Sequence, residues 1–420
     1  MRIFMFFAFL VAMVPASAQW KTKRIRTREV REMLTELSDD RMQGRKPLTP
    51  GIELAADYIS GMFKSAGLQP LTPGGDYRQR FQTSQSVVRE QSVSLNGQDL
   101  SAMDFMVFAG AERIDWANKG AEVVRLGRSG NPIQEAVGLI QGDRDLIVLA
   151  DTAQRRSLQR LRNARMQRMG AGKTVVIAFY GGDVSSYRVR ATATVSRNEY
   201  ANVVGIIPGR TRPEELVLFS AHYDHLGFGK PVGQDSIYNG ANDDASGTTA
   251  VMALAKLFAK GPRPERTLVF AAFTAEESGG YGSRYFSQQL DPARVQAMFN
   301  IEMIGTESKW GLGSAYITGF EKTDFGTILQ RNLEGTGFVF HADPYPAQNL
   351  FYRSDNATLA ALGVPAHTIS TSKMDSEKYY HTVDDEIGTL DLDNMTRIIR
   401  AIALSSISIV QGKDTPSRVK

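Results

Sequence analysis

Along the second half of the chain, short apolar runs alternate with longer segments whose apolar residues recur at helical spacing. The runs predict buried strands, and the periodic segments between them predict helices. The predicted strands cover 202–207, 216–220, 267–273, 297–301, 315–318 and 366–370, and the predicted helices cover 247–259, 282–289, 323–333, 354–362 and 390–410. Strands that alternate with helices are typical of a mixed, mostly parallel sheet with helices on both faces, so we expect an α/β fold of that kind.

The N-terminal part predicts two helices before the chain enters this sheet. Residues 27–37 have a helical pattern, with Thr27 as a candidate N-cap. Residues 51–66 have a second helical pattern, which Gly67 closes. Residues 77–81 then lead into a strand, so we assign 19–86 and 196–412 to one main domain.

Between 87 and 195 the pattern changes to short β-prone pieces without the regular helices of the main domain. These pieces cover 92–95, 105–108, 122–126, 145–149 and 174–179. A helix is predicted over 153–169, and it carries six arginines. A basic helix could bind anions, but arginines on the solvated outer face of a packed helix are the preferred interpretation. We expect 87–195 to form an inserted accessory or lid domain.

The two chain ends have sequence patterns that differ from the rest of the chain. Residues 1–18 have the pattern of a secretory signal peptide, with Arg2, an apolar stretch and a small-residue cleavage site at Ala16-Ser17-Ala18. We therefore expect an exported, periplasmic or secreted protein, without stable membrane insertion once the signal is removed. The polar residues 413–420 are expected to form a frayed tail.

Composition limits the chemistry that the chain can perform. The hydrophobic fraction of 42% supports a sizeable core, and a net charge of +4 over 420 residues does not suggest a nucleic-acid partner. The chain has no cysteine, which excludes disulfides, thiolate nucleophiles and cysteine-ligated zinc. Any metal must be held by histidine and carboxylate side chains. The candidate imidazoles are His222, His225, His341, His367 and His381.

Polar side chains follow several of the predicted strands directly. Sites in parallel α/β sheets form beyond the carboxyl ends of the strands, which is where these residues fall. A mixture of imidazoles and carboxylates at such positions is what a hydrolytic zinc centre requires. A lone glutamate inside an apolar run, as at position 302, would be costly unless it is paired or metal-bound. The residues concerned are His222, Asp224, Asp243, Asp244, Glu276, Glu277, Glu302 and His381, with Asp385 nearby.

The order of these motifs resembles the co-catalytic dizinc aminopeptidase family, number twenty-eight among metallopeptidases. The resemblance covers about 37–81 and 202–410 and leaves the middle insert without a counterpart. It implies a zinc-exopeptidase fold of the phosphorylase/hydrolase-like kind and peptide substrates. The motifs are His222-Tyr223-Asp224, Gly240-Ala241-Asn242-Asp243-Asp244-Ala245-Ser246-Gly247, Ala275-Glu276-Glu277, Asn300-Ile301-Glu302-Met303-Ile304-Gly305 and Tyr380-His381-Thr382 with Asp385.

The resemblance also implies a set of metal ligands for two zinc ions per chain. Asp243 would bridge the two ions. His222 and Glu302 would complete the ligands of one ion, and Glu277 and His381 those of the other. The family often has Asp where Glu302 stands, which changes the reach of that ligand by one methylene.

The remaining roles concern proton transfer and orientation. The resemblance implies that Glu276 is the general base for attack by metal-bound hydroxide, and that Asp224 orients His222 from behind. His225 is expected to lie behind the ligands or on the surface, and Asp244 to be a hydrogen-bonding loop residue. Relatives often have His in the place of Asn356, which bears on the substrate pocket more than on the metals.

Several activities fit this pattern. The preferred one is an aminopeptidase that hydrolyses the N-terminal peptide bond of peptides. A carboxypeptidase-type member, a glutaminyl-cyclase-like acyl transferase with a single zinc, and a non-catalytic binding domain are the alternatives. The sequence does not determine the preferred N-terminal residue, the peptide length, the role of the insert or the oligomeric state.

Overall fold

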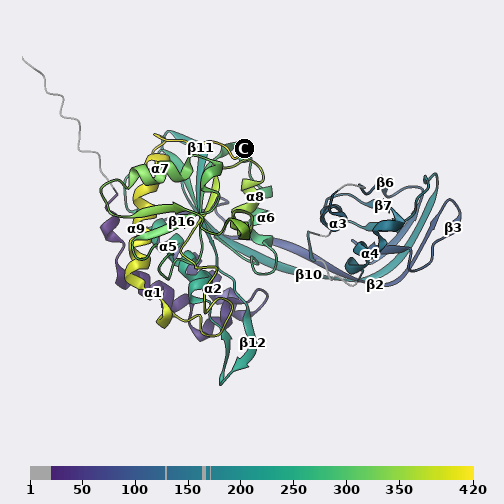
Figure 1. Ribbon diagram of the computed structural model, residues 1–420, viewed down its shortest axis with the longest axis horizontal. Coiled ribbons are helices and arrows are strands. Elements are labelled where there is room, and N and C mark those ends of the chain that lie inside the picture. The colour runs from purple at the N-terminus through teal and green to yellow at the C-terminus, as the bar shows by residue number, and fades with distance from the viewer. Residues whose placement is uncertain (1–19, 128–129, 163–166, 171) are drawn as a thin grey trace, which may run out of the picture.

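The structure is a computed structural model that describes residues 20–127, 130–162, 167–170 and 172–420. A large lobe and a small lobe are joined by a long arm of two strands, β2 (Arg78–Leu95) and β10 (Tyr187–Ile207) (Figure 1). The expected signal peptide, residues 1–18, lies outside the described residues. Among the residues described, no helix combines the length and the apolar character needed to cross a membrane.

The large lobe is built on one mixed sheet. Its strands follow the spatial order β17-β16-β18-β15-β11-β14-β10-β2-β3. The central strands β11, β14, β15 and β18 pair in parallel, whereas β10 and β16 join them antiparallel. This confirms the expected α/β fold. The bounds are β3 Gln98–Asp99, β11 Arg212–His222, β14 Arg266–Phe273, β15 Val295–Ile301, β16 Ser314–Ile317, β17 Val339–Ala342 and β18 Ala366–Ser370.

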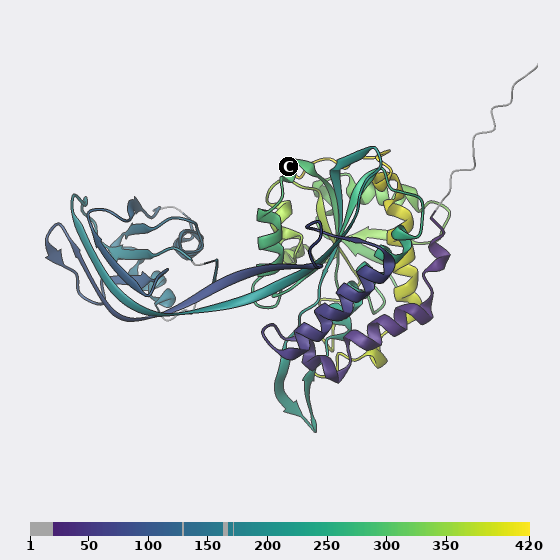
Figure 2. The same ribbon diagram turned by 180° about the vertical axis from the view of Figure 1, so that it is seen from behind.

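Helices cover both faces of this sheet, because alternate residues of each central strand point to opposite sides. On β11, Val217 and Phe219 belong to one core cluster, and Leu216 and Leu218 to another. Figure 2 shows α1 and α2 in purple beside the yellow α9 on the first face. That face is covered by α1 (Thr27–Leu37), α2 (Pro50–Ala66), α5 (Gly247–Ala259), α7 (Phe325–Asn332) and α9 (Leu392–Val410), and the second by α6 (Tyr281–Gln288) and α8 (Ala357–Ala360).

The small lobe has three layers. A four-stranded sheet, β4-β9-β7-β6, packs one face against the far ends of β2 and β10 and the other against two helices. Each interface has its own apolar cluster. The elements are β4 (Phe105–Phe108), β5 (Arg113–Ala117), β6 (Glu122–Arg125), β7 (Leu146–Ala150), β9 (Val175–Phe179), α3 (Pro132–Ile140) and α4 (Arg155–Leu158). The arm strands cross the expected boundaries at 87 and 195, so each belongs to both lobes.

The helix predicted over 153–169 is wrong in extent. Among the residues of this segment that the structure describes, only those of α4 are α-helical, between short 3₁₀ turns, and Met169 lies in β8 (Gln167–Met169), which pairs with β2. Arg168 is buried and donates to the backbone carbonyls of Phe108 and Ala109, so the outer-face interpretation fails for this arginine. Tertiary pairing with β2 overrides the local helical spacing in this segment.

The expected frayed tail is also wrong. The Val419 backbone N–H donates to the Gly363 carbonyl at 3.0 Å. The Ser417 N–H donates to the Asp324 carboxylate at 2.6 Å. These contacts dock residues 413–420 on the large lobe because the tail supplies backbone partners that its polar sequence does not reveal.

Two smaller pairings complete the architecture. A short β1 (Gln69–Pro70) pairs with β10. The hairpin of β12 (Gly227–Val232) and β13 (Asp235–Tyr238) follows the end of β11 and projects from the large lobe (Figure 1). This hairpin lies between two motifs that the sequence analysis singled out.

Candidate metal centre

Three neighbouring parallel strands deliver the polar residues to one edge of the sheet. β11 ends at His222, β14 is followed by Glu276 and Glu277, and β15 is followed by Glu302. Because β14 and β15 both pair in parallel with β11, their carboxyl ends meet at the same edge. The predicted site residues therefore lie where α/β sheets place their ligands.

The loop that carries Asp243 is held from two sides. The Asp385 carboxylate accepts the backbone N–H groups of Asn242 and Asp243, at 2.8 and 3.0 Å. Burial raises the pKa of Asp385 to about 7, while these two hydrogen bonds oppose that rise. Asp244 accepts from the Gly247 and Met303 N–H groups, so it is a hydrogen-bonding loop residue, as expected.

Arg45 supports the same loop from the N-terminal segment. Its guanidinium is fully buried and donates to the carbonyls of Tyr223, Asn239 and Gly240, at 2.8, 2.5 and 2.8 Å. It also donates to the Leu37 carbonyl at 2.8 Å. One side chain thus joins the end of α1, the segment after β11 and the loop before α5.

Asp243 lies at the centre of the cluster. Its Oδ1 is 3.2 Å from His222 Nε2, and its Oδ2 is 3.2 Å from His381 Nε2. His381 Nε2 is also 3.1 Å from Glu277 Oε1. Glu302 lines the same cleft as Asp243 and Glu277. The five residues expected as ligands therefore lie together.

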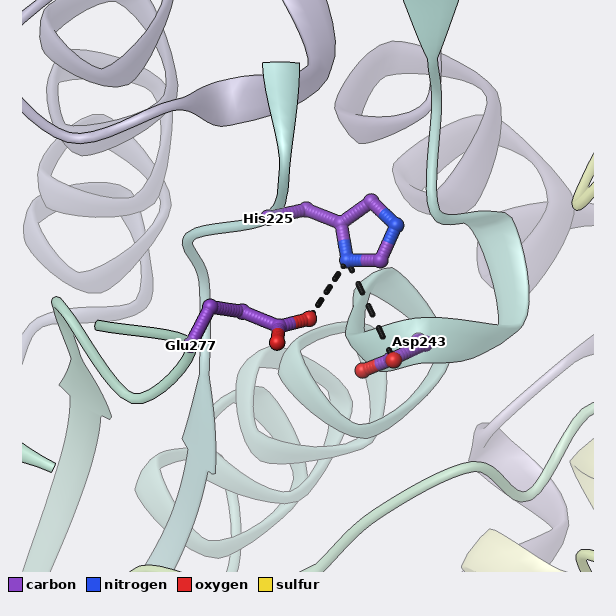
Figure 3. Close-up of side chains that lie close together, drawn as sticks. All are labelled: His225, Asp243 and Glu277. Atoms are coloured by element: carbon purple, nitrogen blue, oxygen red, sulfur yellow. Dashed lines mark hydrogen bonds and ion pairs between the residues drawn. The ribbon is translucent and has the colours of Figure 1, made fainter. Parts of the chain in front are cut away.

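A third imidazole, that of His225, joins the cluster. His225 Nδ1 is 2.9 Å from Glu277 Oε1 and 3.9 Å from Asp243 Oδ2 (Figure 3). One ligand atom from each of these three residues lies within 4.8 Å of the others, so the group could hold a metal ion. Of the two places expected for His225, behind the ligands or on the surface, the structure shows the first, since the residue is buried against Glu277. Its position three residues after His222, beyond the same strand end, was the available signal.

Asp224 acts differently from the expectation. His222 Nδ1 lies 3.1 Å from the backbone carbonyl of Asp224, whereas the carboxylate oxygen is 3.8 Å away. That carboxylate instead accepts the backbone N–H of Glu276 at 3.0 Å. The backbone of residue 224 therefore orients the imidazole, and its side chain fixes the start of the Glu276-Glu277 turn.

The cluster concentrates buried negative charge. Burial raises the pKa of Glu302 to about 7 and that of Glu276 well above its usual value. Burial lowers the pKa of His381, but hydrogen bonds to Asp243 and Glu277 outweigh it and raise this pKa to about 10. Such shifts mark a site that attracts positive charge.

The donor set fits a divalent metal. Within the described part of the chain, Glu302 Oε2 is buried without a hydrogen-bond partner, as is His225 Nε2. A buried carboxylate oxygen without a donor is costly unless a cation meets it. Imidazole nitrogens and carboxylate oxygens are zinc ligands, so the residues present fit zinc.

The cleft above the cluster has a volume of about 70 Å³. Its walls combine the carboxylates with hydroxyl-bearing and apolar side chains. Besides Asp243, Glu276, Glu277 and Glu302, it is lined by Met303, Tyr316, Thr318, Leu350, Arg353, Ser354, Thr368, Ser370, Ser372, Met374 and Tyr380.

Comparison with known proteins shows that part of the chain matches a protein family. Residues 202–406 match the model described as peptidase family M28. A probable zinc metalloprotease of Leptosphaeria maculans is 36% identical over 110 residues, which are 26% of this chain and 25% of that protein. Leucine aminopeptidase 1 of Ajellomyces capsulatus is 30% identical over 214 residues, which are 46% of this chain and 52% of that protein. The chain spans about a quarter of the length of the first curated relatives that it matches.

Solved structures share the fold. An aminopeptidase from Aneurinibacillus sp. strain AM-1 has a TM-score of 0.55 at 19% identity, over 92% of this chain and 94% of that one. BSAP, a zinc aminopeptidase from Bacillus subtilis, has a TM-score of 0.55 at 17% identity, over 94% of this chain and 98% of that one. At these identities the similarity concerns the fold, and the site must carry the functional argument.

Proposed function

We propose, from the premise that residues 202–406 belong to peptidase family M28, that the chain is a zinc-dependent aminopeptidase. It would remove residues from the free N-terminus of peptides by hydrolysis. The observation that carries the proposal is the convergence of two imidazoles on the two oxygens of Asp243. The names of the relatives, a zinc metalloprotease and a leucine aminopeptidase, point the same way.

The residues would hold two zinc ions, one on each side of Asp243. His222 and Glu302 would complete the ligands of one ion, and Glu277 and His381 those of the other. When bound, the metal supplies a Lewis acid and lowers the pKa of a water molecule. His225 faces the Glu277 side, where it supports that carboxylate through the 2.9 Å contact.

Glu276 would move the proton of the reaction. Its side chain lines the cleft, and its backbone N–H is held by Asp224. It would accept a proton from the attacking water and deliver it to the nitrogen of the leaving amine as the peptide C–N bond breaks. Its raised pKa, which arises from burial, suits a carboxyl group that must carry a proton in the middle of the cycle.

Substitution at Glu276 tests this assignment. Glu276→Gln keeps the size of the side chain and removes the base, so kcat should fall by about 10²–10⁴-fold while zinc stays bound. Glu277→Gln is the matched control, one residue away, and it should lose zinc as well as activity. Retention of wild-type turnover by Glu276→Gln would show that the base is another residue.

Metal counting separates the alternatives. Two zinc ions per folded chain after dialysis are expected. One tightly held zinc, together with pyroglutamate formation from peptides with N-terminal Gln, would favour the cyclase-like alternative. Hydrolysis from the C-terminus of peptides blocked at the N-terminus would favour a carboxypeptidase.

Export is proposed separately, from the signal-like pattern of residues 1–18. N-terminal sequencing of the protein made in its own cell should then begin near Gln19. A mature chain that still begins at Met1 would contradict export by this route.

A further inference from the structure

The wall of the cleft is chemically mixed. Besides the carboxylates, Thr318, Ser354, Thr368 and Ser370 contribute hydroxyl groups. Arg353 also lines the cleft, and it is the one cationic side chain among the described residues that do so. The cleft is thus lined by several carboxylates and by one guanidinium.

Two of these hydroxyl groups already donate to the protein. The Thr368 hydroxyl donates to the Asn356 side-chain oxygen at 2.9 Å. The Ser370 hydroxyl donates to the Met303 carbonyl at 3.3 Å. These groups stabilise the wall and have no proton left to offer to a ligand.

The guanidinium of Arg353 keeps most of its donors free. It is exposed, and its Nη1 donates to the Gln348 side-chain oxygen at 3.3 Å. Within the parts of the chain that the structure describes, no carboxylate lies at ion-pair distance from it. An arginine fork has five N–H donors, so most of its capacity remains free.

The backbone holds Arg353 in place. The Arg353 N–H donates to the Leu350 carbonyl at 3.1 Å, which ends the short turn Leu350–Tyr352. Leu350 and Phe351 are buried. The Asn356 side chain donates to the Phe351 carbonyl at 2.8 Å and to the Ala366 carbonyl of β18 at 3.1 Å. The guanidinium is therefore carried by a fixed segment beside the central sheet.

We propose that Arg353 binds a carboxylate of the substrate and makes the enzyme selective for peptides that present one in this cleft. A planar guanidinium donates two parallel hydrogen bonds to a carboxylate. Arg353 would thus fix the direction in which such a peptide lies. This inference rests on the proposed peptidase function.

The carboxylate can come from two sources. It is either the acidic side chain of the N-terminal residue, or the C-terminal carboxylate of a short peptide. Both present the same chemistry to the guanidinium, and matched substrates distinguish them.

The test measures kcat/KM with the full-length, zinc-loaded protein. Glu-, Gln- and Leu-anilides form the side-chain arm, and Leu-Gly with Leu-Gly-amide form the C-terminal arm. In at least one arm the wild type should prefer the carboxylate substrate. Arg353→Gln should lower kcat/KM for that substrate by on the order of 10- to 100-fold, mainly through KM, and leave the neutral partner within about threefold. Arg353→Lys, which keeps the charge without the fork, should recover part of the loss.

Lys373→Gln is the charge-matched control. Lys373 pairs with Glu307 at 2.8 Å and lies between the lining residues Ser372 and Met374 without lining the cleft itself. Its loss should not change the preference. If wild type shows no preference in either arm, or if Arg353→Gln weakens all substrates equally, the inference is overturned while the proposed function stands. Hydrolysis of none of the substrates by the wild type would overturn the proposed function and this inference together.

Discussion

Arg45→Met removes a buried cation that the metal-binding loop depends on. Arg45 donates to five backbone carbonyls: those of Leu37, Tyr223, Asn239 and Gly240 at 2.5–2.8 Å, and that of Asp243 at 3.4 Å. Methionine fills a similar space but donates nothing. The substitution therefore tests whether the N-terminal segment contributes to the site.

The cost in stability follows from these contacts. A hydrogen bond to a charged group contributes about 1.5–3 kcal/mol, so the four shorter bonds give an upper bound of about 6–12 kcal/mol. Removing the cation also removes its desolvation penalty, and the loss of one partner of a buried charged group typically costs about 3–5 kcal/mol. We expect a loss of about 3–5 kcal/mol in the free energy of unfolding, which is a large part of the usual 5–15 kcal/mol.

Urea unfolding measures this loss, and Arg266→Met provides the control. Arg266 is equally buried and lies at the start of β14, the opposite end of that strand from Glu276. It donates to the Ile409 and Asp414 carbonyls at 2.8 and 2.7 Å and pairs with Glu215 at 2.5 Å. Both variants should lose stability. Arg45→Met alone should weaken zinc binding by about 10- to 100-fold at equal folded fraction. Equal zinc affinity in the two variants would refute the idea that Arg45 supports the loop of Asp243.

Two further predictions concern histidines. His225→Phe removes the 2.9 Å contact to Glu277 and should lower zinc affinity by about 10- to 100-fold, measured by chelator competition; unchanged affinity would mean that this imidazole only packs. Burial lowers the pKa of His367 from 6.5 to about 4. Between these pH values the unfolded chain therefore binds more protons than the folded one. The free energy of unfolding should fall by about 3 kcal/mol as the pH drops from 6.5 to 4. His367→Gln should remove this loss, so that the free energy of unfolding changes less between pH 6.5 and 4. An unchanged slope would show that other groups cause the pH dependence.

Regular elements of the main domain could be predicted because their patterns are local. Residues 27–37, 247–259 and 366–370 were predicted with the bounds that α1, α5 and β18 have. The arm was not predicted. Apolar and polar residues alternate along β10 from Tyr187 to Ser196, which is a strand pattern that the sequence analysis did not use. Residues 82–92 of β2 are largely polar and exposed, and they show no such alternation.

The residues of the site could be predicted from the sequence for a different reason. His222, Glu276 and Glu302 each follow an apolar strand, and parallel strands bring such positions together. The exchange of roles within residue 224 could not be predicted, because a sequence does not show whether a carboxylate or its own backbone carbonyl faces an imidazole. The contribution of His225 depended on the turn after β11, which places its ring against Glu277.

The polypeptide leaves and returns to the large lobe at one point, where Gln82 and Glu199 are paired neighbours on β2 and β10. Beside them Phe81 stacks on Tyr200 and on Tyr285, which closes the large lobe at this point. A gene that joins the two positions through a tight hairpin turn would encode a shortened protein without the small lobe. The small lobe thus has the layout of a cassette carried on one pair of strands, and Gln141 and Gln167 add side contacts to Arg284 and Tyr281 of the large lobe.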